Sequence, residues 1–187
     1  MSTFRAFIAI PLPDEVQTFV GALCQTWSEQ IPDRTVRWVK PQLMHVTLRF
    51  LGDTKFSSLP ALVEVLDGIG IRHDAFTLHL DRPGCFPNEK RPRVVWVGLQ
   101  GQLDAARALK QNIDEALVLL GWEREDRSFR PHLTVGRVKN SRNVRGYHWE
   151  ADVDPLTIAV KEIQLIESVL QRTGPVYTVR HKSVLRL

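Results

Sequence analysis

The same four-residue pattern, histidine, apolar residue, threonine, apolar residue, occurs twice in this chain of 187 residues. The first copy begins at His45 and the second at His132. Successive side chains of an extended strand point to opposite faces, so each histidine shares a face with the threonine two positions later, while the apolar residues share the other face. The pattern therefore predicts two strands, each with one buried face and one polar face.

Strict alternation also assigns the residues around the two motifs to faces. It puts Phe50 on the core face of the first strand, and it puts Arg130 on the same polar face as the second histidine and threonine. Arg137 falls on the core face unless a bulge near Gly136 turns it outward. Trp96, inside an apolar run, is expected to pack in the core.

Strands and helices alternate irregularly along the chain. Apolar residues at helical spacing predict helices at residues 16–27, 58–69 and 103–120. Strands are predicted at residues 4–10, 36–39, 43–51, 76–80, 94–99, 129–138, 156–170 and 176–185, with a long loop at 82–93. Each half contains a strand, a helix and a motif strand, and no linker separates them. We therefore expect an α+β fold with two antiparallel-rich sheets, each backed by helices, and the motif strands lining the cleft between them.

Composition excludes several classes of protein. The only cysteines, Cys24 and Cys85, form no CxxC pair, so a disulfide framework and a cysteine metal site are not supported. No stretch has membrane-spanning length, and the N-terminus lacks the features of a signal peptide, so we expect a cytoplasmic protein without a membrane partner. The net charge is +4, with basic clusters at residues 90–93 and 137–145, which permits a polyanionic partner.

Two imidazoles that face one substrate can divide acid and base catalysis, because one can be neutral and the other protonated near neutral pH. The hydroxyls of Thr47 and Thr134 can donate hydrogen bonds to phosphate oxygens from opposite sides. Arg130 can offer a planar cation to the same phosphate. The residues therefore favour phosphoryl transfer without a metal ion.

The chain resembles the 2H phosphoesterase family, and most closely its bacterial RNA 2',3'-cyclic phosphodiesterase branch, also called 2'-5' RNA ligases. The resemblance covers nearly the whole chain. Beyond the two HxTx motifs, it rests on residues 4–10 (FRAFIAI), 45–52 (HVTLRFLG) and 129–137 (FRPHLTVGR).

The resemblance implies a single bilobal domain, residues 1–187, with pseudo-twofold symmetry around a central cleft and with no metal or cofactor. It implies hydrolysis of an RNA-terminal 2',3'-cyclic phosphate to a 2'-phosphate. His132 would accept the proton of the attacking water and His45 would donate one to the ribose 3' oxygen, although the reverse assignment stays open. Thr47, Thr134 and Arg130 would bind the phosphate.

The expected partners are RNA with a 2',3'-cyclic phosphate end, tRNA fragments among them, and cyclic nucleotides, and the protein is expected to be a monomer. Two alternatives stay open. The same histidines could hydrolyse a 2',5'-phosphodiester or, in reverse, ligate an RNA 5' hydroxyl to a cyclic end. The motifs could also form a non-catalytic RNA-end-binding module.

Overall fold

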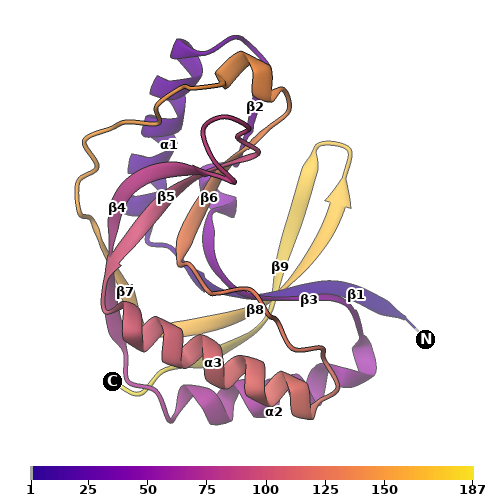
Figure 1. Ribbon diagram of the computed structural model, residues 1–187. Coiled ribbons are helices and arrows are strands. Elements are labelled where there is room, and N and C mark those ends of the chain that lie inside the picture. The colour runs from indigo at the N-terminus through magenta and orange to yellow at the C-terminus, as the bar shows by residue number, and fades with distance from the viewer. Residues whose placement is uncertain (1) are drawn as a thin grey trace.

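The computed structural model describes residues 2–187, which form a strongly curved antiparallel sheet with three α-helices (Figure 1). The helices are α1 (Asp14–Gln30), α2 (Leu59–Gly70) and α3 (Leu103–Leu119), and short 3-10 turns occur at Pro41–Leu43, Phe56–Ser58 and Ser141–Val144. The strands are β1 (Thr3–Pro11), β2 (Val36–Trp38), β3 (His45–Lys55), β4 (Phe76–Phe86), β5 (Val94–Gly101), β6 (His132–Val138), β7 (Thr157–Val160), β8 (Glu162–Gln171) and β9 (Gly174–Val184).

The strands pair in the order β7-β4-β5-β6-β3-β1-β8-β9, with β2 added alongside β6. All pairings between these strands are antiparallel, so the α+β class is confirmed. The two expected sheets are continuous, because the single pair Val46 and Leu133 connects β3 to β6. The sheet consequently has two halves, and the motif strands are the ones that meet between them.

Helix α1 lies apart from helices α2 and α3 (Figure 1). Helix α1 buries Val16, Val20, Cys24 and Trp27, which recur at helical spacing on one face. Trp27 packs beside Trp38 of β2, with ring centroids 6.2 Å apart, so α1 supports the half that contains β6. Helices α2 and α3 lie side by side, and α2 contacts β9, whereas α3 contacts β3 and β4, one strand from each half.

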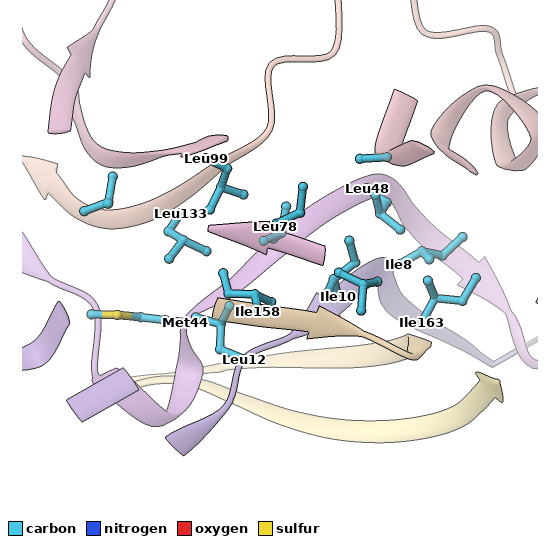
Figure 2. Close-up of a cluster of buried hydrophobic side chains, with 14 of the residues drawn as sticks. Ile8, Ile10, Leu12, Met44, Leu48, Leu78, Leu99, Leu133, Ile158 and Ile163 are labelled. Carbon is cyan, nitrogen blue, oxygen red and sulfur yellow. The ribbon is translucent and has the colours of Figure 1, made fainter. Parts of the chain in front are cut away.

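One hydrophobic core runs through both halves. Figure 2 shows Ile8 and Leu48 from β1 and β3 in the same cluster as Leu78 and Leu133 from β4 and β6. The apolar residues of both motifs, Val46 and Leu133 among them, are fully buried in this core. The buried face that alternation predicts for each motif strand is therefore present.

The apolar stretch at residues 156–170 forms two strands rather than one. The chain leaves the sheet at Lys161, so that β7 pairs with β4 in one half and β8 pairs with β1 in the other. Strand β4 is also longer than expected, since it continues to Phe86 through an irregularity between Leu80 and Pro83. The loop expected at residues 82–93 is correspondingly shorter.

Candidate active site

The two HxTx motifs lie on neighbouring strands and face the same side of the sheet. The register that pairs Val46 with Leu133 places His45 beside Thr134 and Thr47 beside His132. Neighbouring strands lie about 4.8 Å apart. Because Val46 and Leu133 point into the core, the two histidines and two threonines point to the opposite face. Each histidine is thus adjacent to the threonine of the other motif.

Both histidines are oriented by the same local hydrogen bond. The Nδ1 of His45 donates to the carbonyl of Leu43 at 2.8 Å, and the Nδ1 of His132 donates to the carbonyl of Arg130 at 2.6 Å. A carbonyl oxygen can only accept, so the hydrogen is on Nδ1 in both rings. The Nε2 of each neutral ring is then an unprotonated nitrogen that can accept a proton from a reacting group.

The two imidazoles are packed against aromatic rings. Phe7 stacks on His45 with a centroid distance of 4.7 Å, and Tyr177 meets the His45 ring edge-on at 5.6 Å. Phe86 lies edge-on to His132 at 5.1 Å. Burial lowers the pKa of both imidazoles, and the carbonyl hydrogen bonds only partly oppose this. The lowered pKa favours the neutral form of both rings in the free protein near pH 7.

A cavity of about 260 Å³ opens in front of the first motif. His45, Thr47 and Thr134 contribute to its wall. The remaining wall combines aromatic side chains, cations and the turn of the β8–β9 hairpin: Trp38, Phe50 and Tyr177, then Arg37, Lys40 and Arg137, then residues 173–176. Hydroxyl donors, cations and aromatic faces together suit a phosphorylated, ring-containing ligand.

Two residues face the cavity against the prediction from strict alternation. Phe50 is 59% exposed and lines the cavity rather than the core. The cause is a bulge in β3 at Leu48, because Arg49 pairs with Ile8 and Thr47 pairs with Ala9. One extra residue exchanges the faces of the residues that follow it up to the next register shift of β3, at Leu51, so Arg49 is turned into the protein instead.

Arg137 reaches the cavity through a second bulge. In β6, Gly136 pairs with Val95 and Thr134 pairs with Trp96, so Val135 is the extra residue. The sequence predicts that Arg137 leaves the core face only if a bulge occurs near Gly136. The structure has such a bulge, and it turns the Arg137 side chain to the face of the second motif. Arg137 is a cation of the cavity that alternation alone assigns to the core.

Arg130 and Trp96 also differ from their expected surroundings. Arg130 precedes β6 and has an exposed side chain, and its carbonyl rather than its guanidinium contacts His132. Like His132, Arg130 does not line the cavity. Trp96 is half-buried on the face of the second motif, with its ring centroid 6.4 Å from that of His132, so the expectation of core packing is wrong for this residue.

Arg49, which the motif analysis did not single out, lies in a buried cluster of charges. Its guanidinium donates to Glu125 at 3.1 Å and to the carbonyl of Glu123. Lys110 of α3, only 5% exposed, bonds to the same Glu125 and to Asp114. The cluster thus ties the first motif strand to α3 and to the segment that leads into the second motif strand.

Two structural features of residues 2–187 bear on the expected class of protein. None of the helices in this range is long and apolar enough to cross a membrane. In the same range, no three His, Cys, Asp or Glu side chains come together in a way that could hold a metal ion.

Known proteins share both the sequence and the fold. The sequence model of the 2'-5' RNA ligase superfamily matches residues 12–172. A protein of Aeropyrum pernix named RNA 2',3'-cyclic phosphodiesterase is 34% identical over 147 residues, which cover 76% of this chain and 82% of the relative. A protein of Methanothermobacter thermautotrophicus with the same name is 32% identical, with 93% and 95% covered.

Two solved structures are similar over nearly the whole chain. TT0787 of Thermus thermophilus is 31% identical with a TM-score of 0.72, and 97% of this chain and 98% of that chain are covered. E. coli LigT in its apo form is 26% identical with a TM-score of 0.76 and complete coverage of both chains. The match to the family model over most of the chain confirms the resemblance carried by the two motifs: this protein belongs to the 2'-5' RNA ligase superfamily of 2H phosphoesterases.

Proposed function

We propose that the protein hydrolyses RNA-terminal 2',3'-cyclic phosphates to 2'-phosphates, with the two HxTx motifs as its catalytic groups. The observation that carries this proposal is the paired geometry of the histidines, each with Nδ1 on a backbone carbonyl, on adjacent strands and on the same face of the sheet. The names of the relatives support the substrate, and E. coli LigT has been solved with 3'-AMP and with phosphate.

The proposed reaction replaces one bond to phosphorus with another. The Nε2 of His132 takes a proton from water as the water oxygen bonds to phosphorus, and the bond from phosphorus to the ribose 3' oxygen breaks. His45, protonated when the anionic substrate is bound, donates its Nε2 proton to that oxygen. The product keeps its phosphate on the 2' oxygen, and each histidine ends in the other's initial protonation state.

The threonine hydroxyls stabilise the charge that develops on phosphorus. Thr47 and Thr134 come from different strands, so they can donate to the two non-bridging oxygens from opposite sides. We assign phosphate binding to Arg130 as well, at the start of the second motif. Its side chain is exposed, so it can swing toward a bound phosphate without breaking an ion pair with any residue in the range 2–187.

The test uses an RNA oligonucleotide with a 2',3'-cyclic phosphate end, incubated with the protein in EDTA. The wild type should convert the cyclic end to a 2'-phosphate, while His45→Ala and His132→Ala should bind the RNA but lose turnover by about 100-fold or more. Conversion that requires an added divalent ion would contradict the two-histidine mechanism. Binding without turnover by the wild type would identify an RNA-end-binding module.

A leaving group that needs no proton separates the acid from the base. With bis(p-nitrophenyl) phosphate, His45→Ala should recover much of its lost activity, because nitrophenolate departs unprotonated, whereas His132→Ala should not. If His132→Ala recovers activity with this substrate and His45→Ala does not, His132 is the acid and His45 the base.

The family description favours one further activity at the same site. With an RNA 5' hydroxyl in place of water, the same proton transfers would bond the 5' oxygen to phosphorus, break the bond to the ribose 3' oxygen and so form a 2',5'-phosphodiester. Product analysis with a 2',5'-linked dinucleotide and with a mixture of cyclic-ended and 5'-hydroxyl RNA distinguishes this activity from hydrolysis of the cyclic end.

A further inference from the structure

Three cations without acidic partners gather at one side of the cavity. Arg37, Lys40 and Arg137 line it, and all three are exposed. None of them lies within 4.0 Å of a carboxylate oxygen of residues 2–187, although eight contacts between other Lys or Arg side chains and carboxylates form in that range. Positive charge at this position is therefore available to a ligand.

The arrangement of two of these cations is unfavourable in the absence of an anion. Arg37 of β2 is directly opposite Arg137 of β6 in the antiparallel register. Like charges at such positions destabilise a sheet, because directly opposite Cβ atoms lie about 4.5–5.5 Å apart. Arg137 faces this way only because of the bulge at Val135. A phosphate bound between the two guanidinium groups would relieve the repulsion and accept hydrogen bonds from both.

The cations line the same cavity as the motif residues His45, Thr47 and Thr134, but Arg137 lies further along β6 than Thr134. Because of the bulge at Val135, the β5 partners of Thr134 and Arg137, which are Trp96 and Val94, are two residues apart, a separation of about 7 Å at the rise of a β-strand. The charge of Arg137 acts on Tyr177, whose ring contacts His45: burial raises the pKa of the Tyr177 hydroxyl, and Arg137 and Arg5 partly oppose this. The charge of Arg137 therefore influences a cavity residue, Tyr177, that contacts the first motif.

Basic loops continue outward from this position. The backbone N–H of Val138, next to Arg137, donates to the carbonyl of Arg93 at 2.9 Å, and that of Gly146 donates to the carbonyl of Glu89 at 3.0 Å. These bonds hold the β4–β5 loop and the segment after β6 together at the end of the sheet near β2 (Figure 1). Both basic clusters seen in the sequence therefore lie on the same side of the molecule as the three cations.

We propose that Arg37, Lys40 and Arg137 form a second phosphate subsite, which binds a phosphate on the 5' oxygen of the nucleoside whose cyclic phosphate is hydrolysed. This inference rests on the proposed function, because it takes the motifs as the site of the cyclic phosphate. The second phosphate can be the diester to the preceding nucleotide or a 5'-phosphate on a single nucleotide. The basic loops favour the diester, since they add positive charge near the three cations for the rest of an RNA chain.

Four substrates test the subsite: adenosine 2',3'-cyclic phosphate, its 5'-phosphorylated form, the dinucleotide ApA with a cyclic end, and the same dinucleotide with a neutral methylphosphonate linkage. The wild type should use the charged dinucleotide with a kcat/KM about 10-fold above that for the nucleoside and for the neutral dinucleotide, as one charge-assisted hydrogen bond would give. If kcat/KM for the 5'-phosphorylated nucleotide equals that for the charged dinucleotide, any phosphate on the 5' oxygen suffices. If it is lower, the subsite prefers the diester. Equal kcat/KM for charged and neutral dinucleotides would overturn the subsite.

A matched pair of variants locates the effect. Arg37→Gln should reduce the preference for the charged dinucleotide to about twofold or less, whereas Arg107→Gln, the same change on the exposed face of α3, should leave it intact. A preference that survives in Arg37→Gln and Arg137→Gln would exclude these residues as the subsite.

Equilibrium binding keeps the subsite testable if none of the four substrates turns over, a result that would instead refute the proposed function. The wild type should bind ApA with a 2'-phosphate end about 10-fold more tightly than adenosine 2'-phosphate, with a steeper dependence on salt. Arg37→Gln should remove most of that difference. Equal affinity of the wild type for the two compounds would refute the second phosphate subsite independently of catalysis.

Discussion

The buried charge cluster around Arg49 gives a sharp prediction about stability. Arg49 is 7% exposed, and its guanidinium contacts Glu125 at 3.1 Å and Asp114 at 3.6 Å. It also donates to the carbonyl of Glu123. Arg49→Met keeps much of the side-chain volume but removes these charge-assisted bonds, which leaves two carboxylates with Lys110 as their remaining cationic partner in the cluster.

The expected loss follows from the exposure of the groups left behind. Removing one partner of a fully buried ion pair costs about 3–5 kcal/mol. The side chains of Asp114 and Glu125 are 22% and 34% exposed, so water and Lys110 offset part of the cost. We expect the free energy of unfolding to fall by about 2–3 kcal/mol. For a domain of this size, that lowers Tm by about 4–12 °C.

Thermal and urea unfolding at pH 7 measure the change, with Arg107→Met as the matched control. The Arg107 pair with Asp104 is exposed on α3, so the same substitution there should change the free energy of unfolding by no more than about 0.5 kcal/mol. If Arg49→Met lowers Tm no further than Arg107→Met does, the reasoning about the buried cluster is wrong.

The pH dependence of the same measurement has a defined sign. Burial raises the pKa of the Glu125 carboxyl, but hydrogen bonds and charge from Lys110 and Arg49 outweigh this and hold the pKa below its ordinary value of 4.5. Because the folded state has the lower pKa, the stabilisation is complete above about pH 4.5 and is lost as pH falls through the folded value. The stability difference between Arg49→Met and the wild type should therefore narrow below pH 4.5.

Three further predictions concern the site. Burial lowers the pKa of both His45 and His132, so kcat/KM for the cyclic dinucleotide should be highest below pH 6.5 and fall above it. A plateau of kcat/KM that extends to pH 8 would contradict neutral histidines in the free protein. Gly84→Ala should lower the free energy of unfolding in urea by about 1–3 kcal/mol and also reduce kcat, because the added Cβ would lie 2.5 Å from the Trp96 ring, which packs near His132. A wild-type kcat in this variant would show that the Trp96 ring can move without disturbing His132. Phe50→Ala should leave Tm within about 3 °C of the wild type but raise KM about 10-fold if the exposed ring stacks on a base, and an unchanged KM would exclude that contact.

Alternation was sufficient to predict the faces of the motifs themselves. Between each histidine and its threonine there is one residue and no bulge, so the two side chains share a face in the structure as they do in an ideal strand. The apolar residue between them is buried in both cases. The α+β class and the three helices were also predictable, because the apolar residues of each helix recur at helical spacing.

Alternation failed immediately after each motif, and for one physical reason. A bulge inserts one residue into one strand only, and it is visible as a mismatch with the partner strand rather than as a residue type. The bulge at Leu48 exchanges the faces of Arg49 and Phe50, and the bulge at Val135 brings Arg137 into the cavity. The partners of Arg49 are also distant in sequence, which left no local signal for its burial.

The two apolar positions inside the motifs explain why the site lies where the halves of the sheet meet. Val46 and Leu133 form the single pair that connects β3 to β6, and both side chains are fully buried. Their burial against one core sets the spacing of the two strands, and that spacing sets the distance across which the histidines and threonines face each other. The pattern therefore specifies more than four polar groups: its apolar residues hold the two halves in the register that brings His45 to Thr134 and Thr47 to His132.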